Sequence, residues 1–166
     1  MFKEIRHTQF PPTAKPLMVY DGNCGFCMYW IIKWKKITEN KVDYKAYQEV
    51  HQQFEDIAEQ HFKDAVRLIT TDGSLYSGPD AAYYTYFNQN KYRFLHLWYN
   101  RYAWFKNLSN WIYKWIANNR GLMYKVSVAL FGMDPRQNKK YWLFYLLLLI
   151  GLIAVMSFYL ANSASQ

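Results

Sequence analysis

The sequence predicts an α/β fold in which a β-α-β unit is followed by a β-β-α unit. Three patterns indicate it: a short apolar run before a helical pattern, an alternating strand pattern after that helix, and a hairpin pattern further on. Right-handed crossover would place these strands in one sheet. The chain has 166 residues, 52% of them hydrophobic, so it is long enough for one packed domain with an appendage and too apolar for a disordered protein.

The first half of the chain begins with an irregular arm, residues 1–16, because three prolines interrupt regular structure there. The apolar run at 17–20 is typical of a buried strand. Asp21 and Gly22 are turn residues, and apolar side chains then recur at steps of three and four residues. This periodicity predicts a helix from Cys24 to about residue 37.

The remaining elements are predicted by the same rules. Alternation at 41–47 predicts a second strand, and an amphipathic pattern at 51–62 predicts a helix. Strands at 65–70 and 74–77 are expected to form the hairpin, followed by a helix that Pro79 opens. A long aromatic helix is expected at about 94–118. The expected domains are an arm at 1–16, an α/β domain at 17–90, a basic aromatic helical extension at 91–140, a membrane helix at 141–160 and a tail at 161–166.

Residues 141–160 form an apolar run of 20 residues without a charge. A helix of about 20 residues spans the hydrocarbon core of a bilayer. Tyr141, Trp142 and Tyr159 lie near its ends, as aromatic residues do at membrane interfaces, and basic residues precede it at 136–140. A buried core helix is the alternative. By the positive-inside rule, we expect a single-pass membrane protein with one C-terminal transmembrane helix and a cytoplasmic N-terminal domain.

Charge is unevenly distributed along the chain. Residues 1–90 carry 10 Lys and Arg against 11 Asp and Glu, whereas residues 91–140 carry 10 against one, together with four tryptophans. Basic residues with stacking aromatic rings can bind nucleic acid, but no nucleic-acid-binding motif is present. We therefore expect no nucleic-acid partner and a basic aromatic interface with an anionic membrane surface.

The chain's two cysteines, Cys24 and Cys27, stand together at the predicted start of the first helix. A thiol at a helix N-terminus faces unpaired backbone N–H groups and the positive end of the helix dipole, which favour the thiolate. Cys24 is therefore the expected nucleophile, and Cys27, about one turn further on, would resolve the mixed disulfide. Asp21 is either a turn residue or a carboxylate that accepts or returns a proton during exchange, although its charge would oppose the thiolate.

A metal site is the alternative for the cysteine pair. Structural zinc takes four ligands, usually from paired Cys or His knuckles. The histidines that could complete such a site stand at unrelated spacings: His7, His51, His61 and His96. We expect no metal and no bound cofactor, and a membrane-tethered metal carrier is a third hypothesis for function.

The stretch "VYDGNCGFCMYWI" resembles the opening of the DCC family of thiol-disulfide oxidoreductases, named for the DxxCxxC motif that Asp21, Cys24 and Cys27 form here. Two further blocks, "LITTDGSLYSGPDAA" and "WIYKWIANNRGLM", are similar to the same family, so the resemblance covers about residues 17–123. It implies a thioredoxin-like fold and a redox-active CxxC. Arg120, in the third block, could bind an anion or cap a helix, and we favour the structural role. Unlike thioredoxins, the segment "FKDAVRLI" has no proline before the strand that faces the CxxC.

Two functions follow from these patterns. The first is a membrane-anchored thiol-disulfide oxidoreductase of the protein-disulfide reductase type, because the cytosol is reducing. Its partners would be a disulfide-containing protein or small-molecule substrate and a thiol electron donor. The alternative is a thioredoxin-like binding module at the membrane without redox catalysis, which the missing proline and the large basic aromatic region favour.

Overall fold

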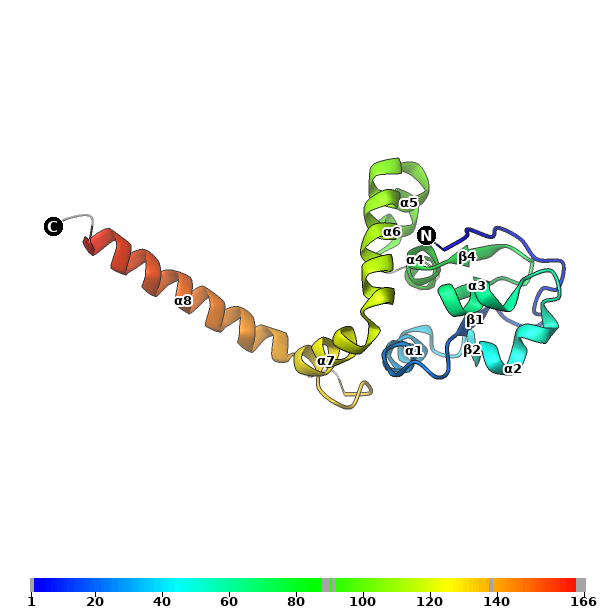
Figure 1. Ribbon diagram of the computed structural model, residues 1–166, viewed down its shortest axis with the longest axis horizontal. Coiled ribbons are helices and arrows are strands. Elements are labelled where there is room, and N and C mark those ends of the chain that lie inside the picture. Colours follow the sequence, from blue (N-terminus) through cyan, green and yellow to red (C-terminus); the bar gives the residue numbers. More distant parts are fainter. Residues whose placement is uncertain (1, 88–89, 91, 138, 164–166) are drawn as a thin grey trace. The chain divides into compact units, whose positions relative to one another are not determined.

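The computed structural model describes residues 2–87, 90, 92–137 and 139–163, and within them the central element is a mixed four-stranded sheet of order β2-β1-β3-β4. The strands are β1 (Leu17–Tyr20), β2 (Asp43–Ala46), β3 (Arg67–Ile69) and β4 (Leu75–Ser77). β1 is parallel to β2 and antiparallel to β3, and β3 is antiparallel to β4. Figure 1 labels β1, β2 and β4 of this sheet. The predicted α/β class is therefore confirmed. The thioredoxin-like fold stays a prediction.

Helices cover both faces of this sheet. The helices and the short 3-10 segment that pack around it are α1 (Gly25–Thr38), α2 (Tyr47–Val50), η1 (His51–Gln53), α3 (Glu59–Asp64) and α4 (Pro79–Phe87). Apolar side chains of α1 and α4 pack on one face, and those of α2 and α3 pack on the other. β1 runs between the two layers, so its alternate side chains enter different clusters.

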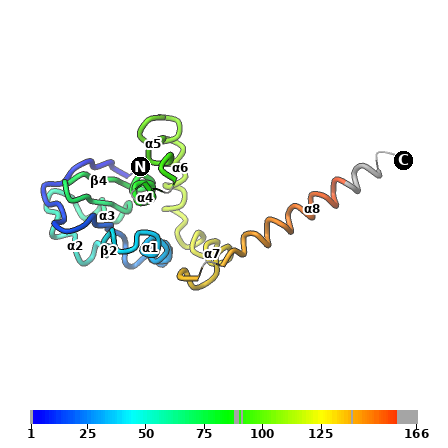
Figure 2. Tube along the Cα trace, turned by 180° about the vertical axis from the view of Figure 1, so that it is seen from behind, coloured from blue at the N-terminus to red at the C-terminus, as the bar shows by residue number. Residues whose placement is uncertain are grey.

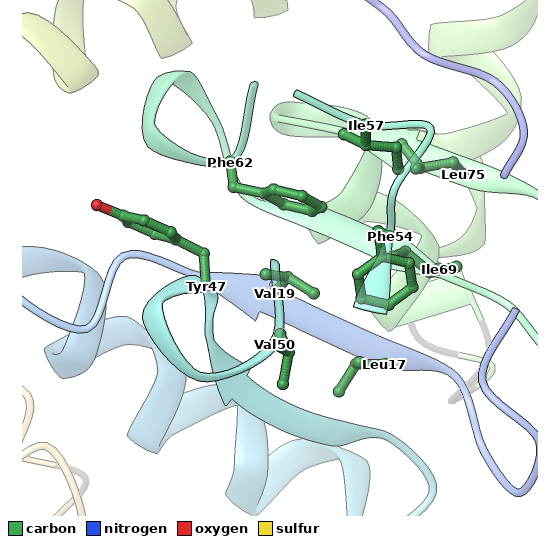
Figure 3. Packing of buried hydrophobic residues seen from close by; sticks show 9 residues of the cluster. All are labelled: Leu17, Val19, Tyr47, Val50, Phe54, Ile57, Phe62, Ile69 and Leu75. Carbon is green, nitrogen blue, oxygen red and sulfur yellow. The ribbon is translucent and has the colours of Figure 1, made fainter. Parts of the chain in front are cut away.

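The larger apolar cluster lies on the α2–α3 face. Figure 3 shows its nine buried side chains: Leu17, Val19, Tyr47, Val50, Phe54, Ile57, Phe62, Ile69 and Leu75. The rings of Phe54 and Phe62 contact each other over the strands, with centroids 5.9 Å apart. On the α1–α4 face, Met18 of β1 and Leu68 of β3 are fully buried in the second cluster. Burial of both faces fixes the strand register, because a one-residue slip would exchange the two sets of side chains.

Arg67 of β3 brings a charge into this interior, with 0% of its surface exposed. Its Nε donates to the carbonyl of His61 at 3.1 Å, and its Nη1 donates to the carbonyl of Lys3 at 2.8 Å and to the hydroxyl of Ser77. Burial lowers the pKa of Arg67 to about 10. The planar guanidinium therefore ties the N-terminal arm, α3 and β4 together in a way that a lysine ammonium could not reproduce.

The structure corrects two predicted helices. The helix expected at 51–62 is replaced by η1, a non-helical stretch and α3, which begins only at Glu59. The helix expected at 94–118 is interrupted at Tyr102, whose extended backbone (φ −113°, ψ 113°) separates α5 (Arg93–Arg101) from α6 (Ala103–Asn118). These two helices lie side by side in both views (Figures 1 and 2).

The chain divides into two compact units, the first ending at Tyr124 and the second beginning at Lys125. The division falls within α7 (Arg120–Phe131). The second unit contains α8 (Tyr141–Ser163), which begins at the first residue of the apolar run. Of the tail expected at 161–166, residues 164–166 lie outside the described part of the chain.

The predicted membrane anchor is wrong. Across residues 2–87, 90, 92–137 and 139–163, no helix combines the length and the apolar character needed to cross a membrane. The uncharged apolar run correctly predicted a helix, α8. A membrane-spanning helix must in addition be both long enough and apolar enough to cross the bilayer. The transmembrane helix at 141–160 and the single-pass localisation with a cytoplasmic N-terminal domain are therefore not supported.

Candidate active site

Cys24 is the N-cap residue of α1, as the sequence predicts. Its backbone is extended (φ −97°, ψ 107°), and its Sγ accepts a hydrogen bond of 3.2 Å from the backbone N–H of Cys27. The Cys24 carbonyl accepts the first helical hydrogen bond from the N–H of Met28 at 3.0 Å. Both cysteines are free thiols and are partly exposed. The Cys24 sulfur therefore lies where helix N–H groups and the helix dipole favour negative charge.

The two thiols differ in acidity. A hydrogen bond from the Cys27 side chain, a second from the Cys27 backbone and the charge of Arg120 lower the pKa of Cys24 to about 6, against an opposing effect of burial. The same side-chain hydrogen bond, with burial and the Cys24 charge, raises the pKa of Cys27. Near neutral pH, Cys24 is therefore the thiolate and Cys27 keeps its proton, which are the protonation states of an attacking and a resolving thiol.

The turn between β1 and α1 holds Asp21 close to Cys24. The backbone N–H of Cys24 donates to the Asp21 carbonyl at 3.3 Å, and the N–H of Asn23 donates to Asp21 Oδ1 at 3.1 Å. Gln48 of α2 clamps this turn, because its Oε1 accepts from the Gly22 N–H at 3.1 Å and its Nε2 donates to Asp21 Oδ1 at 3.0 Å. No sequence pattern pointed to Gln48.

In the same turn, the atoms around residue 22 leave no room for a side chain, so this position requires glycine. A Cβ at this position would lie 2.8 Å from the Cβ of Ala46 and 3.2 Å from Oε1 of Gln48. The first of these is shorter than real Cβ contacts, so a side chain would push the turn away from the end of β2. The turn that carries Asp21 and Cys24 can therefore approach the sheet only because residue 22 lacks a side chain.

Arg120, the first residue of α7, reaches this turn although it lies 99 positions after Asp21 in the sequence. Its Nη1 forms an ion pair with Asp21 Oδ2 at 3.2 Å, and its Nη2 donates to the Lys63 carbonyl at 3.1 Å. The side chains of Arg120 and Asp21 are 26% and 21% exposed, so the pair is largely shielded from water. The third similar block of sequence contained Arg120 but gave no indication of this partner.

Tyr113 of α6 completes the described surroundings of the cysteines. Its hydroxyl oxygen accepts a hydrogen bond of 3.1 Å from the backbone N–H of Val66. Burial raises the pKa of Tyr113 to about 12, with a smaller contribution from Cys27. Val66 belongs to the segment that lacks the thioredoxin proline, and it therefore has the N–H that a proline would not offer. The sequence indicated the missing proline but not this tyrosine.

The histidines considered as metal ligands are dispersed. Nδ1 of His96 pairs with Asp80 Oδ1 at 2.8 Å, and Nδ1 of His51 lies 3.0 Å from the Tyr47 carbonyl. His7 forms an isolated bridge with Ser74. In the part of the chain that the structure describes, no group of three or more Cys, His, Asp and Glu side chains is arranged to hold a metal ion. The assignment of Asp21, Cys24 and Cys27 as site residues stays a prediction.

A comparison with protein families agrees with the resemblance seen in the sequence. The model of the DCC1-like thiol-disulfide oxidoreductases matches residues 18–126, which include the cysteine pair, Asp21, Tyr113 and Arg120. Comparison with curated proteins gives no match, and neither does comparison with solved structures. The family match covers more than half of the chain and the whole of the site described above. This chain belongs to the DCC1-like thiol-disulfide oxidoreductase family.

Proposed function

We propose that this protein is a thiol-disulfide reductase in which Cys24 attacks a substrate disulfide and Cys27 resolves the mixed disulfide. Family membership supports a redox function for the CxxC pair. The observation that carries the finer assignment is the position of the Cys24 sulfur at the N-cap of α1, hydrogen-bonded to Cys27. It supports a division of roles in which one thiol is ionised before the other.

In the first step, the Cys24 thiolate attacks one sulfur of the substrate disulfide. A bond forms between Cys24 Sγ and that sulfur, the substrate S–S bond breaks, and the second substrate sulfur leaves as a thiolate that takes up a proton from water. The low pKa of Cys24, about 6, keeps most of this thiol in its reactive form at neutral pH. The substrate is a protein or small molecule that carries a disulfide.

In the second step, Cys27 loses its proton and attacks Cys24 Sγ. The Cys24–Cys27 disulfide forms, and the remaining substrate sulfur leaves as a thiolate, so that two electrons have passed from the protein to the substrate. We propose Asp21 as the acceptor of the Cys27 proton, since it lies in the turn that holds Cys24. A dithiol, or two monothiols, then reduces the protein disulfide and is itself oxidised.

The proposal is tested by the reduction potential of the full-length protein, measured in glutathione or dithiothreitol buffers with trapping of free thiols. We expect a reversible two-electron transition between about −270 and −180 mV, because a pKa of about 6 lies between those of the thioredoxin and DsbA nucleophiles and is nearer to that of thioredoxin. A potential more oxidising than about −180 mV would contradict the reductase direction. Failure to form any intramolecular disulfide would overturn the redox function and favour a binding module.

Trapping gives an independent test of the two roles. The chain has only two cysteines, so a mixed disulfide formed by the Cys27→Ser variant must involve Cys24. We expect Cys27→Ser to accumulate a mixed disulfide with a disulfide-containing model peptide, and Cys24→Ser to accumulate none. Equal trapping by both variants would contradict the assignment of Cys24 as the attacking thiol.

A further inference from the structure

The ion pair between Asp21 and Arg120 is fixed at both ends. Asp21 is held by the turn that ends at Cys24 and by Gln48 of α2, whose amide donates to its Oδ1 at 3.0 Å. Arg120 is held by its second nitrogen, which donates to the Lys63 carbonyl at 3.1 Å. Neither charge can be moved without breaking backbone or side-chain hydrogen bonds, so both charges keep a constant place beside the first turn of α1.

This placement brings opposite charges to one thiol. The backbone N–H of Cys24 donates to the Asp21 carbonyl at 3.3 Å, so a cation paired with the Asp21 carboxylate is necessarily held near Cys24 as well. The guanidinium attracts a thiolate, whereas the carboxylate repels it. Because the pair is largely shielded from water, both effects are stronger than they would be on an open surface.

We propose that the Asp21–Arg120 ion pair sets the reactivity of Cys24, with Arg120 stabilising its thiolate and Asp21 limiting that stabilisation. In this role the two residues tune the attacking thiol and do not exchange electrons or form bonds with substrate. The inference rests on the proposed function where it concerns disulfide exchange. The acidity of Cys24 can nevertheless be measured whether or not the protein turns over a substrate.

The pKa of Cys24 is shifted in the directions that these two charges predict. The charge of Arg120 acts to lower the pKa of Cys24, and that of Asp21 acts to raise it, although both effects are smaller than that of the Cys27 hydrogen bond. Two other ionisable groups lie near the pair: the charge of Tyr113 raises the pKa of Arg120, and the charge of Asp21 raises the pKa of Lys63. Both of these groups are left unchanged in the variants below.

The test is the pH dependence of alkylation of Cys24 by iodoacetamide in the full-length reduced protein. We expect Arg120→Gln to move the titration midpoint upward and to slow alkylation about 3- to 10-fold below that midpoint, because the thiolate loses its cation. We expect Asp21→Asn to move the midpoint downward. Both variants break the same ion pair, so a purely structural role predicts shifts in the same direction or none. Either of those results would overturn the proposal.

Three further variants separate charge from folding. Arg120→Lys keeps the positive charge and should return the midpoint toward that of the wild type. Lys106→Gln is the matched control, because it removes a different ion pair, formed with Glu4 at 2.7 Å, and should leave the Cys24 midpoint unchanged. Asn cannot repel a thiolate but can still accept the hydrogen bonds of the turn, so the downward shift in Asp21→Asn tests the proposal even if Arg120→Gln does not fold. A midpoint shift in Lys106→Gln as large as those at the site would contradict it.

The outcomes also separate this proposal from the redox function. Opposite midpoint shifts in a protein that forms no reversible disulfide would support the tuning role and reject the reductase. A reversible disulfide with the same potential and midpoint in wild type, Arg120→Gln and Asp21→Asn would support the redox function and overturn the tuning role. In a working reductase, Arg120→Gln should also become more reducing, since its dithiol form loses the stabilised thiolate.

Discussion

The hydroxyl of Tyr113 accepts a hydrogen bond from the backbone N–H of Val66 across 47 positions of sequence. This contact joins α6 to the segment just before β3. It gives a hydrogen-bond acceptor to this part-buried amide. The contact thus links the helical extension directly to the sheet that carries the cysteines.

Replacement of Tyr113 by Phe should destabilise the protein. The variant keeps the ring and its edge-to-face contact with Phe2, but the Val66 N–H loses its acceptor. A fully buried amide without an acceptor costs about 1–3 kcal/mol. Because the Val66 N–H is part-buried, we expect a loss near the lower end, about 1 kcal/mol, in the free energy of unfolding by urea. Tyr102→Phe, at an exposed position, is the control and should change stability little. Equal stability of Tyr113→Phe and wild type would show that the hydrogen bond contributes nothing.

The acidity of Cys24 should depend on what stands at position 27. The largest cause of its low pKa, about 6, is the hydrogen bond from the Cys27 side chain. We therefore expect Cys27→Ala to raise the pKa of Cys24 toward its ordinary value of 9.0. Cys27→Ser keeps an O–H donor and should raise it less. Thiolate absorbance measured against pH distinguishes the two, and identical titrations of the Ala and Ser variants would refute the hydrogen-bond explanation.

Cys24 should also make the stability of the reduced protein depend on pH. Its pKa is lower in the folded state, about 6, than its ordinary value of 9.0, so folding is favoured where the thiolate exists. This contribution is fully present above about pH 9 and is lost as the pH falls through about 6. The stability difference between wild type and Cys24→Ala should therefore grow from pH 6 to 8.5. Urea unfolding under reducing conditions measures it, and a constant difference would argue against a lowered pKa.

Gly22→Ala should disturb the active-site turn. The added Cβ would lie 2.8 Å from that of Ala46, so the turn must shift or the end of β2 must give way. Introducing a methyl group without room typically costs about 1–3 kcal/mol, and the alkylation rate of Cys24 should change with it. Gly121→Ala is the matched control, because nothing lies within 4 Å of its Cβ and it stands within a helix. That variant should gain about 0.5–1 kcal/mol, and a comparable loss there would show that the effect at Gly22 is not steric.

Arg67→Lys should be strongly destabilising although it keeps the charge. The guanidinium donates to two carbonyls and a hydroxyl from three separate segments, and a single ammonium cannot reach all of them. We expect a loss of about 2–4 kcal/mol in urea unfolding, because buried polar groups are left without partners. The exposed Arg6→Lys is the control for the same chemical change and should be nearly neutral. A small loss at Arg67 would mean that water or a shifted lysine satisfies these groups.

Local sequence patterns were sufficient for the elements that hold the cysteines. The apolar strand at 17–20, the Asp-Gly turn and the helical periodicity after Cys24 all act within a few residues of one another, and the structure contains each of them. The helix predicted at 51–62 is wrong because Phe54 and Ile57 lie in a non-helical stretch that packs their side chains onto the sheet. Apolar residues three positions apart fit one face of a helix, but they also fit turns that cover a core.

The rest of the site could not be predicted, because it is built from distant contacts. Arg120 pairs with Asp21 across 99 positions of sequence, and the spacing of apolar residues along the chain does not predict such a contact. Gln48 is an exposed residue of a short helix, and only the fold brings its amide to the turn. The membrane-anchor prediction failed for a different reason. It took an uncharged run of apolar residues as sufficient evidence for a transmembrane helix, and none of the described helices is a candidate membrane span.

Because Arg120 is distant in sequence from the CxxC motif, transferring the motif alone to another protein would not transfer its charge environment. A graft of "YDGNCGFC" onto another scaffold would carry the thiols, the cap and the carboxylate, but would leave behind the cation that stands opposite them. The transplanted thiols would then be exposed to an unbalanced negative charge. For protein engineering, the smallest transferable module is therefore the whole stretch from the active-site turn to the start of α7.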